Sequence, residues 1–190
     1  MRFQINFDYL CPFARNANEA VIAGLEAGRD WDVTFRPFSL SQVHTNEGDP
    51  PVFDDVSASG VRALLWGVAI RDSEPEHFPA AHMALFSARH DQGRDVTDES
   101  VIRDALADTG VDIEAIAAVV ESGTPAKSLA TEHNESVERW QVFGVPTFIK
   151  DDVATFIRFM DRGNLADLDR ALDMLDWSGL NEFKRTTRSR

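Results

Sequence analysis

The chain contains one cysteine, Cys11, and this residue has the clearest capacity for nucleophilic chemistry. Pro12 follows it directly, and the alanine-rich residues 13 to 27 are typical of a helix. A thiol is nucleophilic as its thiolate, which a helix N-terminus favours through unpaired amides and the positive end of its dipole. The pattern predicts a Cys11 thiol of lowered pKa, faced by the free amides of Phe13 and Ala14.

Strands and helices in alternation must position this cysteine. Alternating apolar residues predict strands at 2–7 and 31–36, and the helix between them implies a parallel pair. Gly28 is expected to cap that helix. The polar segment Ser39 to Asp55, with its glycine and prolines, is expected to be a loop.

Helical periodicity replaces the strand pattern in the middle of the chain. Helices are expected at 57–71, 78–92, 98–107, 113–121 and 126–143. Asp112 is expected to cap one of them, and Thr124 another with Pro125 at its first position. Strands return at 147–150 and 153–159, joined by a tight Asp151-Asp152 turn, and Asn164 precedes a final helix.

Composition limits the classes of function. The 190 residues include 19 basic and 32 acidic side chains, a net charge of −13 that disfavours binding to nucleic acid or an anionic membrane. One cysteine cannot form an internal disulfide, and the first residues read as a strand rather than a targeting segment, so we expect a cytoplasmic protein. The five histidines show no paired ligand spacing, and we expect no metal site.

Two motifs far apart in the chain resemble those of one family. The segment Phe7 to Ala14 reads F-D-Y-L-C-P-F-A and is similar to the D-x-x-C-P-x-C active-site segment of the DsbA-like thioredoxin family. The segment Phe143 to Phe148 reads F-G-V-P-T-F and resembles the family's G-V-P-T-F loop. Ala81-His82 resembles a segment of the FrnE-like and 2-hydroxychromene-2-carboxylate isomerase-like branches. Residues 159–162 resemble a stretch of the kappa-class glutathione transferases.

The resemblance implies an α/β thioredoxin-like fold with an all-helical insertion between the second and third strands. Residues 1–55 and 144–180 would form the thioredoxin-like part, 56–143 the insertion, and 181–190 a basic, frayed tail. Pro146 would be cis beside the thiol. It would leave the Val145 backbone free to pair with an extended thiol peptide, with Thr147 as a further polar contact.

Ala14 is the departure from the family pattern, because dithiol members carry a resolving cysteine at that position. The leading hypothesis is a monothiol oxidoreductase. The Cys11 thiolate attacks a small or protein disulfide, and an external low-molecular-weight thiol of the glutathione or mycothiol type resolves the adduct. The alternatives are a transferase or isomerase of the kappa-class or hydroxychromene type and a non-catalytic binding module. The oligomeric state stays open, a homodimer included.

Further residues are candidates for the site. Asp8 is either a buried acid that tunes proton transfer or a solvated loop residue, and its charge would raise the thiol pKa. Tyr9, Phe13 and Trp66 either wall an apolar substrate pocket or belong to the core. His82 is either a proton donor near the thiol or a packing residue.

Overall fold

The computed structural model describes residues 1–54 and 60–179, and its strands form one four-stranded sheet in the order β2-β1-β3-β4. The strands are β1 (Arg2–Phe7), β2 (Asp32–Pro37), β3 (Thr147–Lys150) and β4 (Val153–Phe156). β1 and β2 are parallel, as expected, whereas β3 is antiparallel to both β1 and β4. Asp151 and Asp152 form the tight turn between β3 and β4, both with positive φ (47° and 69°), as two-residue hairpins of this kind require.

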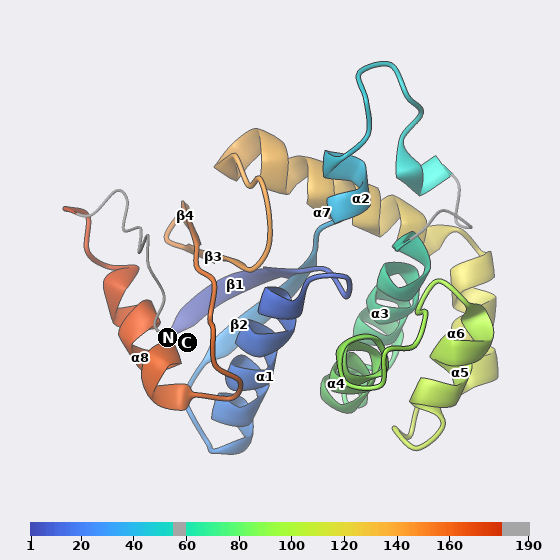
Figure 1. Ribbon diagram of the computed structural model, residues 1–190, viewed down its shortest axis with the longest axis horizontal. Helices are drawn as coiled ribbons and strands as arrows, with labels where there is room; N and C mark the ends of the chain where they lie inside the picture. Colours follow the sequence, from blue (N-terminus) through green and yellow to red (C-terminus); the bar gives the residue numbers. More distant parts are fainter. Residues whose placement is uncertain (55–59, 180–190) are drawn as a thin grey trace.

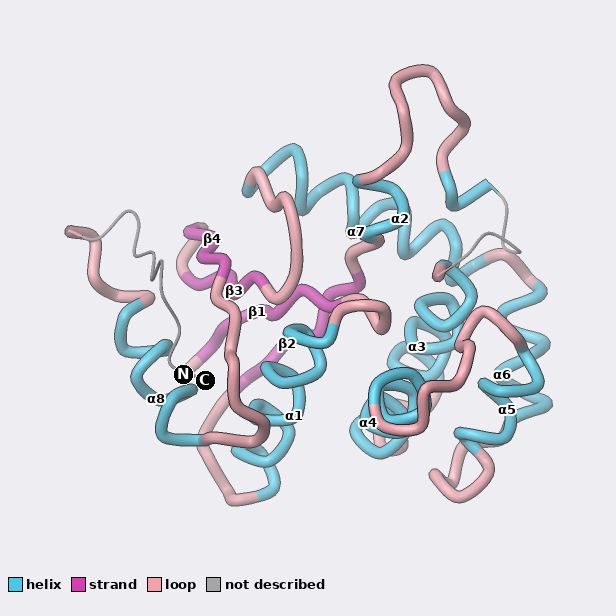
Figure 2. The backbone as a smooth tube through the Cα atoms, viewed as in Figure 1, coloured by secondary structure: helices cyan, strands magenta, loops and turns pink. Residues whose placement is uncertain are grey.

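Helices cover both faces of the sheet. They are α1 (Pro12–Glu26), α2 (Leu40–Val43), the 3-10 turn η1 (Val52–Asp54), α3 (Val61–Ser73), α4 (Phe78–His90), α5 (Glu99–Leu106), α6 (Ile113–Glu121), α7 (Thr124–Trp140) and α8 (Leu165–Met174). α1 and α8 lie on one face of the sheet and α7 on the other, while α3 to α6 gather beside α1 (Figures 1 and 2). The expected α/β fold with an all-helical insertion between β2 and β3 is confirmed.

The central strand β1 is more buried than its sequence alternation predicts. Phe3, Ile5 and Phe7 are buried, but so is the intervening Asn6, whose Nδ2 donates to Ser136 Oγ of α7 over 3.1 Å. The alternation predicts one buried face. Because helices cover both faces of this sheet, a polar residue on the second face is also enclosed and needs a partner there.

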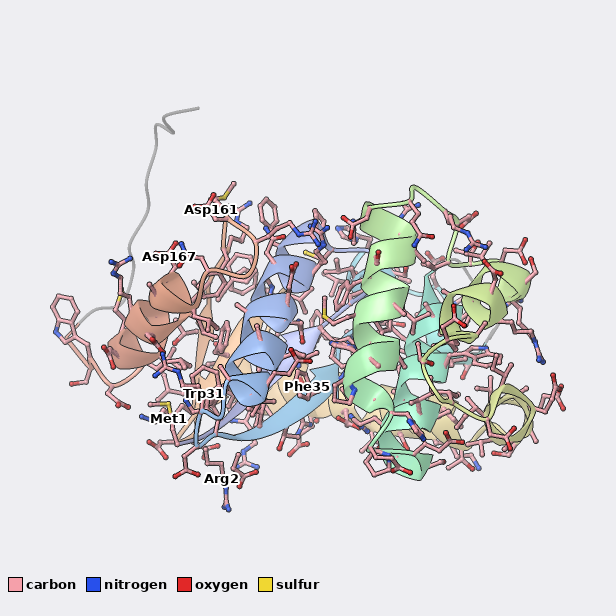
Figure 3. All side chains as sticks on the ribbon, turned by 90° about the horizontal axis from the view of Figure 1, so that it is seen from below. Met1, Arg2, Trp31, Phe35, Asp161 and Asp167 are labelled. Atoms are coloured by element: carbon pink, nitrogen blue, oxygen red, sulfur yellow. The ribbon has the colours of Figure 1, made fainter. Side chains whose placement is uncertain are left out.

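α1 approaches the sheet closely at its C-terminal end. A Cβ at Gly24 would lie 2.1 Å from the Trp31 ring, so only glycine leaves room for that indole. Trp31 also packs edge-on against Phe3, with ring centroids 5.9 Å apart. Figure 3 shows this face of the molecule, with Trp31 labelled beside the end of α1. The helix that begins beside Cys11 is thus fixed on the sheet at its other end.

Three of the differences from the sequence prediction have a local physical cause. The expected loop 39–55 contains α2 and η1, because Ser39 Oγ caps α2 by accepting from Gln42 N and Phe53 is buried. β4 ends at Phe156 rather than 159, since its partner β3 begins only after Pro146, which has no N–H. α7 ends at Trp140, before Gln141 in the left-handed conformation.

The expected caps are found with one exception. Asp112 and Asn164 cap α6 and α8 through their side chains, and Gly28 follows α1 with a φ of 78°. The N-cap of α7 is Gly123, so Thr124 is the first helical residue and not the cap. The expected helix start at Ser57, the division at residues 55 and 56, and the basic segment 181–190 lie outside the described residues. Within the part of the chain that the structure describes, no helix has the length and apolarity needed to span a bilayer.

Candidate functional site

Cys11 is the N-cap of α1, directly after the short turn that follows β1. Its backbone N–H donates to Asp8 O over 3.1 Å, and its extended conformation turns the chain into the helix. The Sγ atom accepts from Ala14 N at 3.4 Å and donates to Val145 O at 3.3 Å. The thiol side chain is buried, with 8% exposure, while the adjacent Pro12 at the first turn of α1 is exposed. The sulfur therefore lies between a helix N-terminus and a second, distant loop.

That second loop is Phe143 to Pro146, which leads into β3. The Val145–Pro146 peptide bond is cis, as the resemblance implied, and it places the Val145 carbonyl against the sulfur. Thr147 is buried, and its hydroxyl donates to Gly144 O over 2.7 Å. Thr147 thus stabilises the loop from within, and its hydroxyl hydrogen is already engaged there.

The electrostatics of Cys11 correct the sequence prediction. Burial raises the pKa of the Cys11 thiol above its ordinary value, although the amides of Ala14 and Phe13 and the charge of Arg158 lower it. The nearby Asp8 carboxylate acts in the same direction as burial. The expectation of a lowered pKa was wrong because the desolvation of a mostly enclosed thiolate outweighs the two amides at the helix N-terminus.

Asp8 is buried beneath the turn that carries Cys11. Its Oδ1 accepts from Leu10 N at 2.9 Å and its Oδ2 from Leu40 N at 2.7 Å, so the carboxylate joins the turn to α2. Burial raises the pKa of Asp8 to about 6, and these two backbone hydrogen bonds oppose that rise. The structure therefore shows Asp8 as a buried acid rather than a solvated loop residue.

Tyr9 and His82 form a buried hydrogen-bonded chain rather than part of an open pocket. Tyr9 Oη lies 2.8 Å from His82 Nδ1, and His82 Nε2 lies 3.0 Å from Asn18 Oδ1. Asn18 Nδ2 donates in turn to Ala14 O in the first turn of α1. Burial lowers the pKa of His82 to about 3, so the imidazole is neutral and both nitrogens are engaged. His82 is therefore a packing residue and not the proposed proton donor.

Of the two alternatives for Tyr9, Phe13 and Trp66, a substrate wall or the core, the structure shows the core for Tyr9 and Trp66. Trp66 is buried in α3, and Arg103 of α5 lies over its ring at 5.3 Å. Tyr9 is enclosed as well, whereas Phe13 is half-buried beside Cys11. Only Phe13 of the three belongs to the surface of the site.

Sequence reasoning missed three residues, Phe143, Phe156 and Arg158, which form a connected group with Phe13 next to Cys11. Phe143 is 68% exposed, and its ring centroid lies 5.1 Å from that of Phe156. The Arg158 guanidinium carbon lies 5.3 Å from the Phe13 ring and 5.7 Å from the Phe156 ring. Phe143 lies directly before the G-V-P-T-F segment, but no motif marks Phe156 or Arg158, because the pairing of the chain after β4 with the cis-proline loop is what brings Arg158 to Phe13.

Comparison with known proteins agrees with this geometry. Residues 4–173 match the model of the DsbA-like thioredoxin domain. The chain belongs to the DsbA-like thioredoxin family. No curated protein matches its sequence. This family assignment covers both the turn of Cys11 and the cis-proline loop.

Solved structures resemble this DsbA-like chain over nearly its whole length at low identity. A 2-hydroxychromene-2-carboxylate isomerase is 20% identical with a TM-score of 0.66, covering 92% of this chain and 96% of its own. The cytosolic disulfide reductase DsbM from Pseudomonas aeruginosa, with GSH, is 16% identical with a TM-score of 0.66, covering 92% and 98%. DsbA from Pseudomonas aeruginosa is 19% identical with a TM-score of 0.63, covering 92% and 80%. At these identities the likeness shows the fold alone.

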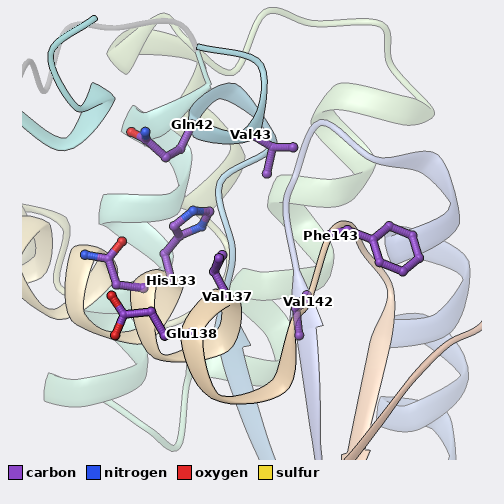
Figure 4. A pocket seen from close by; sticks show the side chains of 8 residues that line it. Gln42, Val43, His133, Val137, Glu138, Val142 and Phe143 are labelled. Carbon is purple, nitrogen blue, oxygen red and sulfur yellow. The ribbon is translucent and has the colours of Figure 1, made fainter. Parts of the chain in front are cut away.

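A groove adjoins the cis-proline loop of this DsbA-like chain between α2 and α7 (Figure 4). It encloses about 420 Å³ and is lined by Gln42, Val43, His133, Asn134, Val137, Glu138, Val142 and Phe143. His133 Nδ1 accepts from Ser39 N over 3.2 Å, and burial lowers the pKa of His133 to about 4. The Phe143 side chain points away from the other lining residues (Figure 4).

The Tyr9→Phe variant tests whether Tyr9 is structural. It removes the hydroxyl that His82 Nδ1 contacts and leaves a buried nitrogen without a partner, so we expect a loss of about 1–3 kcal/mol in the free energy of unfolding, measured by urea denaturation. Alkylation of Cys11 in the folded protein should stay within about twofold of wild type, since the Tyr9 hydroxyl contacts His82, whereas the sulfur contacts Ala14 N and Val145 O. Unchanged stability with slowed alkylation would instead assign Tyr9 to the reactive site.

The pH dependence of Cys11 alkylation tests the electrostatics. Only the thiolate reacts, and burial raises its pKa, so the iodoacetamide rate should keep rising beyond the free-cysteine pKa of about 8.5. Asp8→Asn removes a charge that raises this pKa and should move the profile to lower pH. Asp108→Asn, a matched change at an exposed position, should not move it. A wild-type rate that reaches its plateau below pH 7.5 would contradict the assignment.

Proposed function

We propose that this protein reduces disulfides with Cys11 as its only protein nucleophile and an external low-molecular-weight thiol as the reductant. The observation that carries the proposal is the position of the Cys11 sulfur, at the α1 N-terminus between Ala14 N and Val145 O. Ala14 stands where the dithiol pattern has its second cysteine, and the chain contains no other cysteine. The second thiol of the reaction must therefore come from outside.

The reaction has two displacement steps. The Cys11 thiolate attacks one sulfur of the substrate disulfide, which forms a mixed disulfide and releases the other half as a thiolate that takes up a proton. An external thiolate then attacks the substrate sulfur of the adduct, which releases the Cys11 thiolate and forms a mixed disulfide of substrate and external thiol. A second external thiolate attacks the external-thiol sulfur of that mixed disulfide and releases the remaining substrate thiol. The substrate gains two electrons and two protons, and two molecules of external thiol become one disulfide. Cys11 returns to its starting state.

The raised thiol pKa favours the reductive direction. A thiolate of higher pKa is a stronger nucleophile and a poorer leaving group. A strong oxidant of this chemistry needs the opposite, a stabilised thiolate that leaves its mixed disulfide readily. Burial of Cys11 and the charge of Asp8 both work against a stabilised thiolate.

The external thiol is proposed to be of the glutathione or mycothiol type, and the substrate a small or protein disulfide. The exposed Pro12 and half-buried Phe13 leave the helix N-terminus accessible beside an otherwise enclosed sulfur, which suits a small extended thiol. The P. aeruginosa disulfide reductase that this chain resembles in fold is described with GSH and as cytosolic. A reducing compartment would supply such thiols, so we propose a cytoplasmic location.

A second candidate function is a transferase or isomerase in which a bound thiol cofactor does the chemistry. The observation that favours it is the Cys11 S–H, which donates to Val145 O. A protonated side chain at this position can donate to the thiolate of a bound cofactor and orient it, and a serine hydroxyl can do the same.

The Cys11→Ser variant separates the two candidates. Disulfide reduction, measured as thiol release from a disulfide substrate with excess glutathione, should fall by at least about 100-fold, because serine forms no comparable nucleophile at neutral pH. Intact-mass analysis of the wild type should show one thiol adduct at Cys11. Retention of most activity in Cys11→Ser would overturn the reductase proposal in favour of the second candidate.

The Ala14→Cys variant tests the need for an external resolving thiol. A cysteine at this position lies beside Cys11 Sγ, since Ala14 N already contacts that atom, and it can attack the adduct intramolecularly. We expect the Cys11 adduct to decay at least about tenfold faster than in Ala14→Ser, which matches it in size but has no thiol. Equal decay in the two variants would show that position 14 cannot reach the adduct.

A further inference from the structure

The backbone of Arg158 is fixed on both sides next to the thiol. Ile157 N donates to the carbonyl of the cis Pro146 over 3.2 Å. Asn16 Nδ2 on α1 donates to Phe159 O over 3.0 Å, and Phe159 is buried with its ring 5.9 Å from that of Phe148. Arg158 is therefore held between the two segments that meet at the Cys11 sulfur, and its position does not depend on a free loop.

The side chain of Arg158 lies on an aromatic surface, which we call the aromatic shelf and which consists of Phe13, Phe156 and the neighbouring Phe143. Its guanidinium contacts the rings of Phe13 and Phe156, and Phe143 packs against Phe156. Stacking restrains a guanidinium but leaves its N–H edge free for hydrogen bonds. The shelf thus orders an exposed cation beside Cys11.

Arg158 differs from the other arginines near the thiol in its partners. Arg15 and Arg162 both bind Asp91, and Arg162 also binds Glu19. Within residues 1–54 and 60–179, Arg158 forms no ion pair with a carboxylate. Its exposed donors are available to a ligand, and a carboxylate is the group that matches them in shape and charge.

The positive charge of Arg158 contrasts with the negative net charge of the whole chain. A protein with a net charge of −13 repels an anionic substrate from most of its surface. A local cation beside the nucleophile reverses that field at short range, where the reacting sulfur must approach. The guanidinium lies over the ring of Phe13, two residues after Cys11, and its charge lowers the pKa of the Cys11 thiol.

We propose that Arg158 is a specificity-determining residue that binds a carboxylate of the substrate, so that the preferred substrates are small disulfides of carboxylate-bearing thiols. The substrate carboxylate pairs with the guanidinium on the aromatic shelf while its disulfide lies over Cys11. The identity of the substrate in this inference rests on the proposed reductase function. The attraction of Arg158 for an anion beside Cys11 can be measured without turnover.

The first test compares two alkylating reagents of similar size, anionic iodoacetate and neutral iodoacetamide, at the single thiol. The ratio of their rates cancels the thiolate fraction and reports the local field at Cys11. In Arg158→Met, the ratio of iodoacetate to iodoacetamide rates should fall by about two- to fivefold, the range expected for an exposed charge pair. It should fall further in Arg158→Glu, and the difference from wild type should shrink at about 1 M salt.

Arg170→Met is the matched control, because it removes one exposed arginine on α8 and gives the same net charge. Its ratio should equal that of the wild type. An equal ratio in Arg158→Met and Arg170→Met would overturn the proposal, since the anion preference would then not depend on position 158.

The second test uses oxidised glutathione and the neutral bis(2-hydroxyethyl) disulfide, with adduct formation at Cys11 followed by intact mass. Arg158→Met should lose about two- to fivefold in rate with oxidised glutathione relative to the neutral disulfide. Equal losses with both disulfides would overturn the substrate assignment. If no adduct forms with either disulfide in the wild type, the reductase function fails, whereas the alkylation ratio still decides the role of Arg158.

Discussion

The two hydrogen bonds of the Cys11 sulfur are the interaction on which the site depends. One comes from Ala14 N in the first turn of α1 and the other goes to Val145 O, 134 residues further along the chain. They require the helix N-terminus and the cis-proline loop to meet at one point, which in turn requires β3 to pair beside β1. The two hydrogen bonds of the sulfur therefore form only when the β1–β3 pairing, the start of α1 and the cis-proline loop are all in place.

Enclosure of the sulfur opposes the effect of the helix N-terminus on the pKa of the thiol. The helix N-terminus offers amides to a thiolate, but desolvation and the Asp8 carboxylate raise the thiol pKa by more than these amides lower it. The result is a protonated resting thiol that is strongly nucleophilic once deprotonated. A thiol of raised pKa suits a reductant better than an oxidant, and this agrees with the lack of a second cysteine in the chain.

The helical insertion supports the reactive turn from the side opposite the loop. α4 supplies His82 to Tyr9 Oη and His90, whose Nε2 lies 2.8 Å from Tyr9 O. Asp91, just beyond α4, binds Arg15 of α1. Tyr9 and His82 are buried and both ring nitrogens of His82 are engaged, so this hydrogen-bonded chain specifies one orientation of the turn rather than merely filling space. The insertion therefore does more than extend the fold, because α4 fixes both the hydroxyl and the carbonyl of Tyr9, two residues before Cys11.

The sequence by itself determined the order of strands and helices, the helical insertion, and the pairing of a cysteine with a distant Val-Pro-Thr loop. The order of elements and the insertion follow from local periodicity and capping residues, which are properties of neighbouring residues, whereas the pairing of the cysteine with the loop is what the resemblance of two motifs to one family implies. It could not determine the thiol pKa, the core role of Tyr9 and His82, the absence of Trp66 from the site surface, or the place of Arg158. Each of these depends on burial and on contacts between segments far apart in the chain. Desolvation and long-range packing exist only once the tertiary structure has formed, which is why the structure alone decided them.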